Sequence, residues 1–469
     1  MRTFLLRWGL PAASVLVSAA LVLTGVAPVA SAQTPTRTYV VHRDGPDVVV
    51  PVHVPATGEA VLDLTVAAPG TDWAVEGAES AVLSVFVGRE YASDVVVTGA
   101  AGSERTVGLG ELRRGGHVLW LRLADARSAA AAEKVVVERL AVSTYAPGDP
   151  GHLAARFTPI LHGRNLANLG DAHQNAVTDT PLLAFHEAGP GSRPGHTRLT
   201  YSVIWSNEDG GTNSPALMAR WGRTTDIEWV YAVEVDESGE RVPGSDVYHG
   251  PDHETRPFTG RYDGDHPLLQ TCTSNNNLCD VVDNPMRFAL SAAQTLPPGK
   301  AREFLMDTNP WTYLLMAKES IREGKVEPPS PETPFTEEVS DQRNYLYAVL
   351  EKRTDRENSG ADWVGVALGV RLRDGDTVYS SHHGRADWSI QRDVPAATTV
   401  ELPAGTTPSD IVEVTARRVV VGTDTGATVR VTGIQRGFLL GPDYLPGESF
   451  LSWSGDVALT AEQPTAVLW

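Results

Sequence analysis

The sequence is poor in cysteine, in basic residues and in long apolar runs. Its 469 residues include only two cysteines, and 39 Lys and Arg stand against 58 Asp and Glu. Beyond the N-terminal segment, no stretch approaches the ~18 apolar residues that a membrane-spanning helix needs. The formal net charge of −19 repels phosphate groups, which argues against nucleic acid and anionic membranes as partners. Such acidity suits cationic or neutral substrates, bound calcium, or simple solubility.

Several familiar catalytic motifs are also missing. The chain has no G-x-S-x-G nucleophile elbow, no P-loop and no dinucleotide-binding glycine fingerprint. Gly250 and Pro251 in "HGPDHE" exclude the helical H-E-x-x-H zinc motif. Serine-nucleophile and nucleotide chemistry therefore have no support in the sequence.

The N-terminus has the pattern of an export signal. Two arginines precede the apolar run "GLPAASVLVSAALVLTGVAPVA", which ends in the small-x-small pattern "ASA" at residues 30–32. We expect residues 1–32 to be a signal peptide and the protein to be secreted, without membrane insertion. In an exported chain, the close pair Cys272 and Cys279 is expected to form one small disulfide loop.

Short β-branched segments broken by Gly, Pro or Asp recur along the chain, which contains 43 Gly and 32 Pro. They predict a mainly β, multi-domain protein of antiparallel β-sandwich or jelly-roll modules with one or two short helices. One helix is expected from Pro310 to Glu323, because Pro opens it and Gly324 stops it. The expected parts are an N-terminal sandwich over 33–146, a central β-rich domain over 147–330, a linker at 331–341 and a C-terminal β-rich domain over 342–469.

The end of the N-terminal block, "LGELRRGGHVLWLRLAD" with the later "EKVVVERLAV", resembles the last strands of galactose-binding-like jelly-roll domains. Such domains often accompany carbohydrate-active enzymes. The resemblance makes Trp73, Tyr91 and Trp120 candidate sugar-stacking side chains, although Trp120 lies in an alternating strand, a pattern that favours the core.

The central domain carries the densest polar pattern, in "DIEWVYAVEVD". Residues two apart in a strand share a face, so Asp226 and Glu228 point to one side. Ile227, Trp229 and Tyr231 would then form the core-facing side. Close carboxylates raise each other's pKa and a neighbouring Arg lowers it, which is one way to obtain an acid and a base in one site. A structural ion-pair network has the same pattern.

Other polar clusters of the central domain complete the candidate site. The candidate catalytic residues are Asp226, Glu228, His186, Glu187 and His266. The candidate substrate-binding residues are Arg164, Arg220, Arg223 and Trp205. The acidic glycine-rich turns "SNEDGG" and "YDGDHP" favour calcium, although most such turns bind nothing; its candidate ligands are Glu208, Asp209, Asp263 and Asp265.

"DIEWVYAVEVDESGE", followed by "YDGDHPLLQTCTSNN", resembles the vacuolar-protein-sorting-associated sixty-two-like proteins. That family carries an acidic D-W-E type of strand and a later segment with two histidines. Asp226, Glu228 and Trp229 match the strand, and His266 matches the later segment. Ile227 stands where the family has Trp, and asparagines replace the second histidine. The resemblance implies a β-rich domain and no particular chemistry.

Two functions remain open. The export signal and the carboxylate and histidine cluster favour a secreted, polysaccharide-degrading enzyme, either a glycoside hydrolase that uses Asp226 and Glu228 or a polysaccharide lyase. The alternative is a non-catalytic secreted protein that binds carbohydrate or the cell surface through β-modules with calcium-stabilised loops. Both readings predict an extracellular polysaccharide or cell-surface glycan as partner and leave the oligomeric state open. An enzyme requires Asp226 and Glu228 to converge with His186, His253 or His266.

Overall fold

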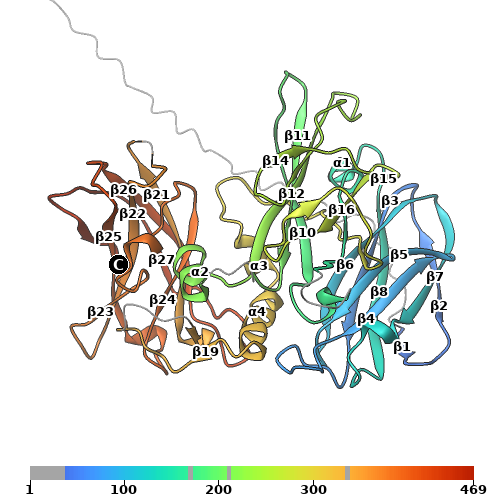
Figure 1. Cartoon of the computed structure of the whole chain (residues 1–469), viewed down its shortest axis with the longest axis horizontal. Helices are drawn as coiled ribbons and strands as arrows, with labels where there is room; N and C mark the ends of the chain where they lie inside the picture. Colours follow the sequence, from blue (N-terminus) through green and yellow to red (C-terminus); the bar gives the residue numbers. More distant parts are fainter. Residues whose placement is uncertain (1–36, 167–172, 209–212, 333–337, 357) are drawn as a thin grey trace, which may run out of the picture.

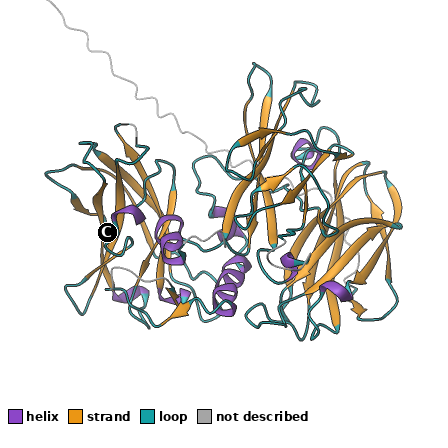
Figure 2. Ribbon diagram, in the orientation of Figure 1, coloured by secondary structure: helices purple, strands orange, loops and turns teal. Residues whose placement is uncertain are grey.

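The computed structural model describes residues 37–166, 173–208, 213–332, 338–356 and 358–469. Strands dominate and the helices are few and short, which confirms the predicted mainly β class of antiparallel modules (Figures 1 and 2). The expected signal peptide, residues 1–32, lies outside the described residues. No helix in the described ranges is long and apolar enough to span a bilayer.

The N-terminal part is a sandwich of two four-stranded antiparallel sheets. One sheet has the order β1 (Tyr39–His42), β8 (Lys134–Tyr145), β3 (Gly58–Ala67) and β6 (Ser103–Leu112). The other has the order β2 (Val48–Val54), β7 (Gly115–Leu123), β4 (Ala81–Val87) and β5 (Glu90–Val97). Alternate Val and Leu side chains from both sheets meet in a shared core, as the period of two requires.

The central part is built on a five-stranded antiparallel sheet. Its order is β10 (Pro181–Pro190), β11 (Thr197–Trp205), β12 (Asp226–Val235), β13 (Val247–His249) and β14 (Thr255–Pro257). Beside it lies a smaller sheet with the order β15 (Tyr262–Asp263), β16 (His266–Thr271), β9 (Ile160–His162) and β18 (Arg287–Phe288), while β17 (Leu278–Cys279) pairs with β16.

The C-terminal part is a second sandwich with its own core. One of its sheets has the order β24 (Ala396–Glu401), β21 (Tyr345–Thr354), β26 (Val429–Phe438) and β27 (Leu451–Leu459). The other has the order β23 (Val378–Ser380), β22 (Trp363–Leu372), β25 (Ile411–Val421) and β28 (Thr465–Val467). Ahead of it, β19 (Val326–Glu327) and β20 (Val339–Ser340) pair in parallel.

Among the described residues, four α-helices cover or connect these sheets: α1 (His152–Arg156), α2 (Ser214–Trp221), α3 (Phe304–Thr308) and α4 (Trp311–Arg322). Helix α4 confirms the helix predicted after Pro310. Helix α2 begins after Asn213, whose side chain accepts a hydrogen bond from the backbone N–H of Ala216, and ends at Gly222. In Figure 1, α2 lies against the C-terminal sandwich, and the threonines of β24 bind its last carbonyls.

Three tryptophans depart from their predicted places. Trp229 is only partly buried, because the pairing of β12 with β11 shifts by one residue and Val230 takes the buried position. Trp120 is half-buried under the guanidinium of Arg89, 5.0 Å from its ring centroid, and so does not belong to the sandwich core. Trp73, a candidate for sugar stacking, is fully buried in the core, so that prediction was wrong.

Candidate functional site

Asp226 and Glu228 lie at the start of β12, where they pair with Trp205 and Val203 of β11. Asp226 is almost fully buried, and Glu228 keeps 29% of its side chain exposed. Burial raises the pKa of Asp226 well above its usual value, and the negative charge of Glu228 raises it further. Burial also raises the pKa of Glu228, against the nearby cationic side chains. The two carboxyls therefore form one interacting pair.

Two histidines lie next to the more exposed carboxyl. His249 Nδ1 is 3.5 Å from Glu228 Oε2, and the imidazole of His249 stacks on Trp229 with 5.2 Å between ring centroids. The ring of His253 lies 5.5 Å from that of His249. Burial lowers the pKa of His249, and the charge of His253 lowers it further, so His249 is neutral near pH 7. A neutral imidazole beside a carboxyl of raised pKa can exchange a proton with it.

The disulfide loop closes the other side of this cluster. Cys272 and Cys279 are bonded, as predicted, and the loop between them carries three consecutive asparagines. Asn276 Nδ2 donates hydrogen bonds to Asp226 Oδ2 at 3.1 Å and to the carbonyl of Asn207 at 3.2 Å. The amides of Asn275 and Asn277 lie 3.2 Å and 3.3 Å from Nε2 of His253. One loop thus holds both the buried carboxyl and the outer histidine.

Three residues with strained backbone lie around the carboxyl pair. Asp179, His253 and Asn276 all have positive φ, at 44°, 62° and 52°. Each such residue costs on the order of 1–3 kcal/mol and persists where surrounding contacts impose it, often at functional sites. The side-chain oxygens of Asn276 and Asn277 are buried and have no hydrogen-bond partner within the described residues. Buried unpaired acceptors of this kind fit a ligand that brings its own donors.

The candidate substrate-binding residues are mostly buried. Arg164 and Asp179 form a fully buried ion pair at 3.0 Å, and buried Arg223 pairs with Glu303 at 3.0 Å. Trp205 is fully buried in the central core. Arg220 is only partly exposed, at the end of α2. Of these side chains, Trp205 belongs to the residue that pairs with Asp226, and the charge of Arg223 lowers the pKa of both carboxyls.

His186 and Glu187 lie further along the strands of the sheet, away from Asp226 and Glu228. His186 of β10 aligns with Tyr201 of β11, which aligns with Tyr231 of β12. Tyr231 is five residues along the strand from Asp226, or about 16 Å at ~3.3 Å per residue. His186 instead binds the carbonyl of Ala292 at 2.7 Å. Glu187 is exposed on the same strand.

His266, Asp263 and Asp265 line a pocket between the N-terminal sandwich and the central part, with a volume of about 570 Å³. His266 Nε2 is 3.3 Å from Glu59 Oε2. Burial lowers the pKa of His266, but the hydrogen bond and charge of Glu59 outweigh it, and the net shift is upward. The predicted residues are therefore divided between two places. Asp226 and Glu228 converge with His253, and His266 does not join them.

The predicted calcium ligands do not come together. Glu208 lies close enough to Asp226 to raise its pKa, whereas Asp263 and Asp265 belong to the pocket at Glu59. Asp209 lies outside the described residues. Within the described ranges, no three His, Cys, Asp or Glu side chains form a metal-binding group. Calcium stays a prediction.

Comparisons with known proteins identify no family. Neither a family model nor a curated protein matches the chain, so the resemblance to the sixty-two-like proteins finds no support. Among solved structures, similarity is found to a carbohydrate-binding module of a xylanase from the hindgut metagenome of Trinervitermes trinervoides. The identity is 13%, the coverage is 25% of this chain and 92% of that one, and the TM-score is 0.19.

Two further structures are similar at the same level. The C-terminal carbohydrate-binding module of LamC from Zobellia galactanivorans is 11% identical over 23% of this chain and 100% of its own, with TM-score 0.15. A cycloisomaltooligosaccharide glucanotransferase from Paenibacillus sp. is 13% identical over 53% of this chain and 40% of its own, with TM-score 0.18. Scores of this size carry no argument, so any functional assignment rests on the site itself.

Proposed function

We propose that the protein is a secreted carbohydrate-acting hydrolase whose site is formed by Glu228, Asp226 and His249. The observation that carries the proposal is the interacting carboxyl pair of raised pKa beside a neutral histidine. Such a pair supplies the acid and base that hydrolysis of a glycosidic bond needs near neutral pH.

The geometry divides the roles. Glu228 is the more exposed carboxyl of the pair, so we assign to it the contact with the substrate. Its raised pKa keeps a proton available for the oxygen of the leaving sugar. Water then adds to the anomeric carbon as the glycosidic C–O bond breaks, and the proton that this water releases passes to the Glu228 carboxylate, which His249 contacts at 3.5 Å. Asp226 is buried behind them, and its pKa, raised well above the usual value by burial and by the charge of Glu228, favours the protonated carboxyl, so it acts as a positioning residue.

The test is product release from a panel of cell-wall and plant polysaccharides by residues 33–469, with and without EDTA. Glu228→Gln should lower kcat at least 100-fold, within the usual range for loss of a general acid. Asp226→Asn should cost less than about tenfold, or 1.4 kcal/mol, because Asn mimics the protonated carboxyl. Glu237→Gln, an exposed carboxylate loop residue, is the matched control.

Each other outcome has a definite meaning. Full activity in Glu228→Gln would remove this site from the reaction. Loss of activity in EDTA, restored by calcium, would support the predicted ion. The second candidate function, a carbohydrate-binding protein, is favoured by the separation of His186 and His266 from the carboxyl pair. Binding to a polymer without any product would establish it.

A further inference from the structure

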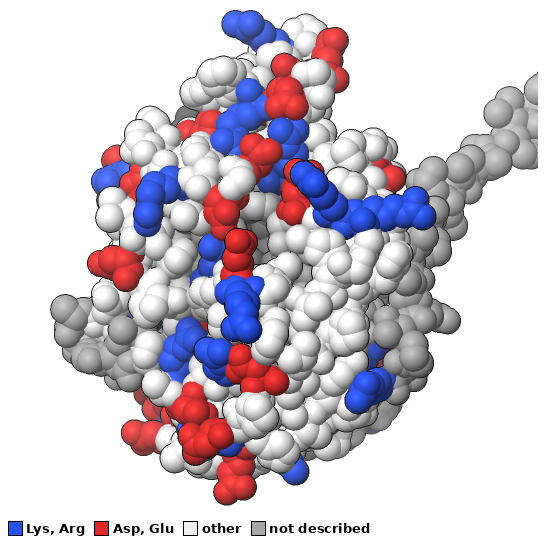
Figure 3. All heavy atoms as spheres, turned by 90° about the vertical axis from the view of Figure 1, so that its right-hand side faces the viewer, with Lys and Arg blue, Asp and Glu red and all other residues white. Residues whose placement is uncertain are grey.

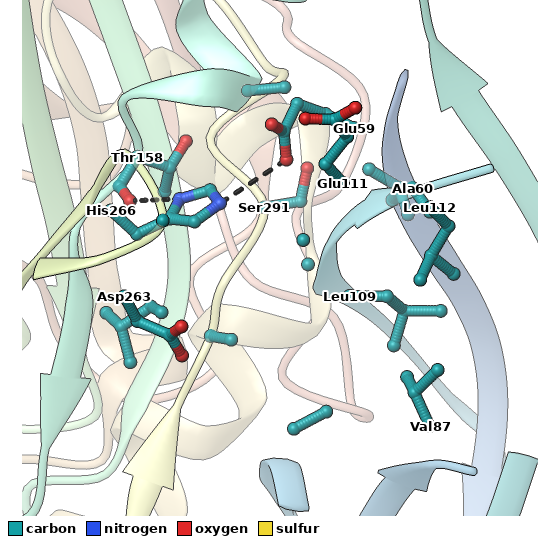
Figure 4. A pocket seen from close by; sticks show the side chains of 18 of the residues that line it. Glu59, Ala60, Val87, Leu109, Glu111, Leu112, Thr158, Asp263, His266 and Ser291 are labelled. Carbon is teal, nitrogen blue, oxygen red and sulfur yellow. Dashed lines mark hydrogen bonds and ion pairs between the residues drawn. The ribbon is translucent and has the colours of Figure 1, made fainter. Parts of the chain in front are cut away.

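A second site lies in the pocket of about 570 Å³ between the N-terminal sandwich and the central part (Figure 4). Its volume falls within the ~300–1,000 Å³ of small-molecule pockets, which often form between domains. One wall comes from β3 and β6, and the other from the segment around α1 and the β15–β16 turn. On this side of the molecule, acidic and basic side chains are interspersed from the upper part through the centre to the lower left (Figure 3).

Two carboxylates of this pocket stand directly opposite each other. Glu59 of β3 pairs in register with Glu111 of β6, so both side chains point to the same face, as Figure 4 shows. Like charges at directly opposed positions of an antiparallel pair are destabilising. A cation that lies between the two carboxylates would offset this repulsion.

The surrounding charges leave one of these carboxylates uncompensated. Glu59 is paired with His266, while Asp263 and Asp265 are held by Arg287 and Arg156. Glu111 is exposed to the pocket and has no ion pair or hydrogen bond through its side chain within the described residues. Glu90, which also lines the pocket, is exposed and likewise forms no ion pair within the described residues, so the lining has too little positive charge, and a cationic group of a ligand would lie beside Glu111.

The other residues that line the pocket indicate the chemistry of the uncharged part of the ligand. Val87, Leu109 and Leu112 provide apolar surface, and Ser291 provides a hydroxyl close to the two carboxylates (Figure 4). Ring faces of sugars pack on apolar surface, and their hydroxyls bond to carboxylates and hydroxyls. The described residues offer no group of three metal ligands here, which argues against a bare divalent ion.

We propose that this pocket binds a saccharide that carries a free primary ammonium group, with the ammonium between Glu59 and Glu111. Ammonium recognition rests on the pocket alone, and the choice of a saccharide rests on the proposed carbohydrate function. An amino sugar whose nitrogen is acetylated has no charge and lacks the group that the pocket selects.

Isothermal titration at pH 6 tests the proposal with residues 33–469 and three probes: a β-1,4-linked glucosamine oligomer, its fully N-acetylated form, and a lysine oligopeptide. The glucosamine oligomer should bind, and its affinity should fall at least tenfold in Glu111→Gln and at high salt. The N-acetylated oligomer should bind at least tenfold more weakly. Glu133→Gln, an exposed glutamate outside the pocket, is the matched control and should bind as the wild type does.

The results separate this inference from the proposed hydrolysis. Binding should persist in Glu228→Gln, whose change lies in the central site, whatever becomes of its activity. Equal binding of the free and acetylated oligomers, or full affinity in Glu111→Gln, would overturn the ammonium assignment. Binding of the lysine peptide alone would overturn the saccharide assignment, and absence of binding to all three probes would overturn both.

Discussion

At the scale of single residues, His383 of the C-terminal part is buried in a neutral form. Burial and, to a smaller extent, the charge of the neighbouring His382 together lower its pKa to about 4. Its ring packs edge-on against Trp388, 6.0 Å between centroids, and Nδ1 lies 3.8 Å from a carboxylate oxygen of Glu401. The nearby carboxylate does not compensate for the lost hydration of a charged imidazole.

This burial makes stability depend on pH. Between pH 6.5 and about pH 4, His383 is protonated in the unfolded chain and neutral in the folded chain. Stability therefore rises with pH across this window and falls on acidification, by about 3 kcal/mol at 1.36 kcal/mol per pKa unit. In guanidinium denaturation at pH 7 and pH 4.5, His383→Gln should lose less stability on acidification than wild type. Exposed His42→Gln should not differ from wild type, and identical pH slopes in all three proteins would contradict the prediction.

At the scale of elements, the loop closed by Cys272 and Cys279 connects stability to the site. The bonded residues are seven apart in sequence, and the loop between them holds Asn276 against Asp226. Loop-closure entropy gives a bridge of this size about 2.5 kcal/mol. Reducing the bridge also frees Asn276 from the backbone conformation with positive φ that the contact requires.

The double substitution Cys272→Ser and Cys279→Ser should therefore lower the free energy of unfolding by about 2.5 kcal/mol in guanidinium titrations. Wild type reduced with dithiothreitol should show the same loss, and the double variant should not change further on reduction. A variant as stable as oxidised wild type would show that the loop keeps its conformation without the bridge.

Local patterns predicted some elements because their causes are local. Helix α4 follows from Pro310 and Gly324, and the disulfide from two close cysteines in a chain whose sequence predicts export. Helix α2 also has local signals, namely the Asn213 cap and Gly222 at its end. It was not predicted, because the small, turn-forming residues that precede it in the sequence obscured these signals. The shared face of Asp226 and Glu228 follows from the period of the strand alone.

Other features depend on partners distant in the sequence and had no local signal. The exposure of Trp229 comes from a shift in the pairing of β12 with β11. The contact of Asn276 with Asp226 joins residues fifty apart, and that of Glu59 with His266 joins two separate sheets. A sequence pattern predicts which side chains share a face, and only the folded topology decides which faces meet.

At the scale of the whole molecule, the three parts are joined by buried contacts. One apolar cluster includes Trp73 of the N-terminal part, the central sheet, and Tyr347 of the C-terminal part. The indole N–H of Trp73 donates to Glu319 of α4 at 2.9 Å, and Arg436 of β26 pairs with Asp307 of α3 at 2.7 Å. Helices α3 and α4 thus connect both sandwiches, and we expect the parts to stabilise one another.

Gly222 offers a direct test of this coupling, because it ends α2 where the helix meets β24. It has φ of 67°, and an added Cβ would lie 2.9 Å from Ala397 Cβ and 3.0 Å from the backbone nitrogen of Thr398. Gly222→Ala should cost about 1–2 kcal/mol for the left-handed backbone and about 1–3 kcal/mol more for the forced separation. Gly244→Ala, with φ of 77° and nothing within 4 Å, should show the backbone cost alone in the same denaturation experiment. Equal losses in the two variants would mean that α2 and the C-terminal sandwich do not hold each other in place.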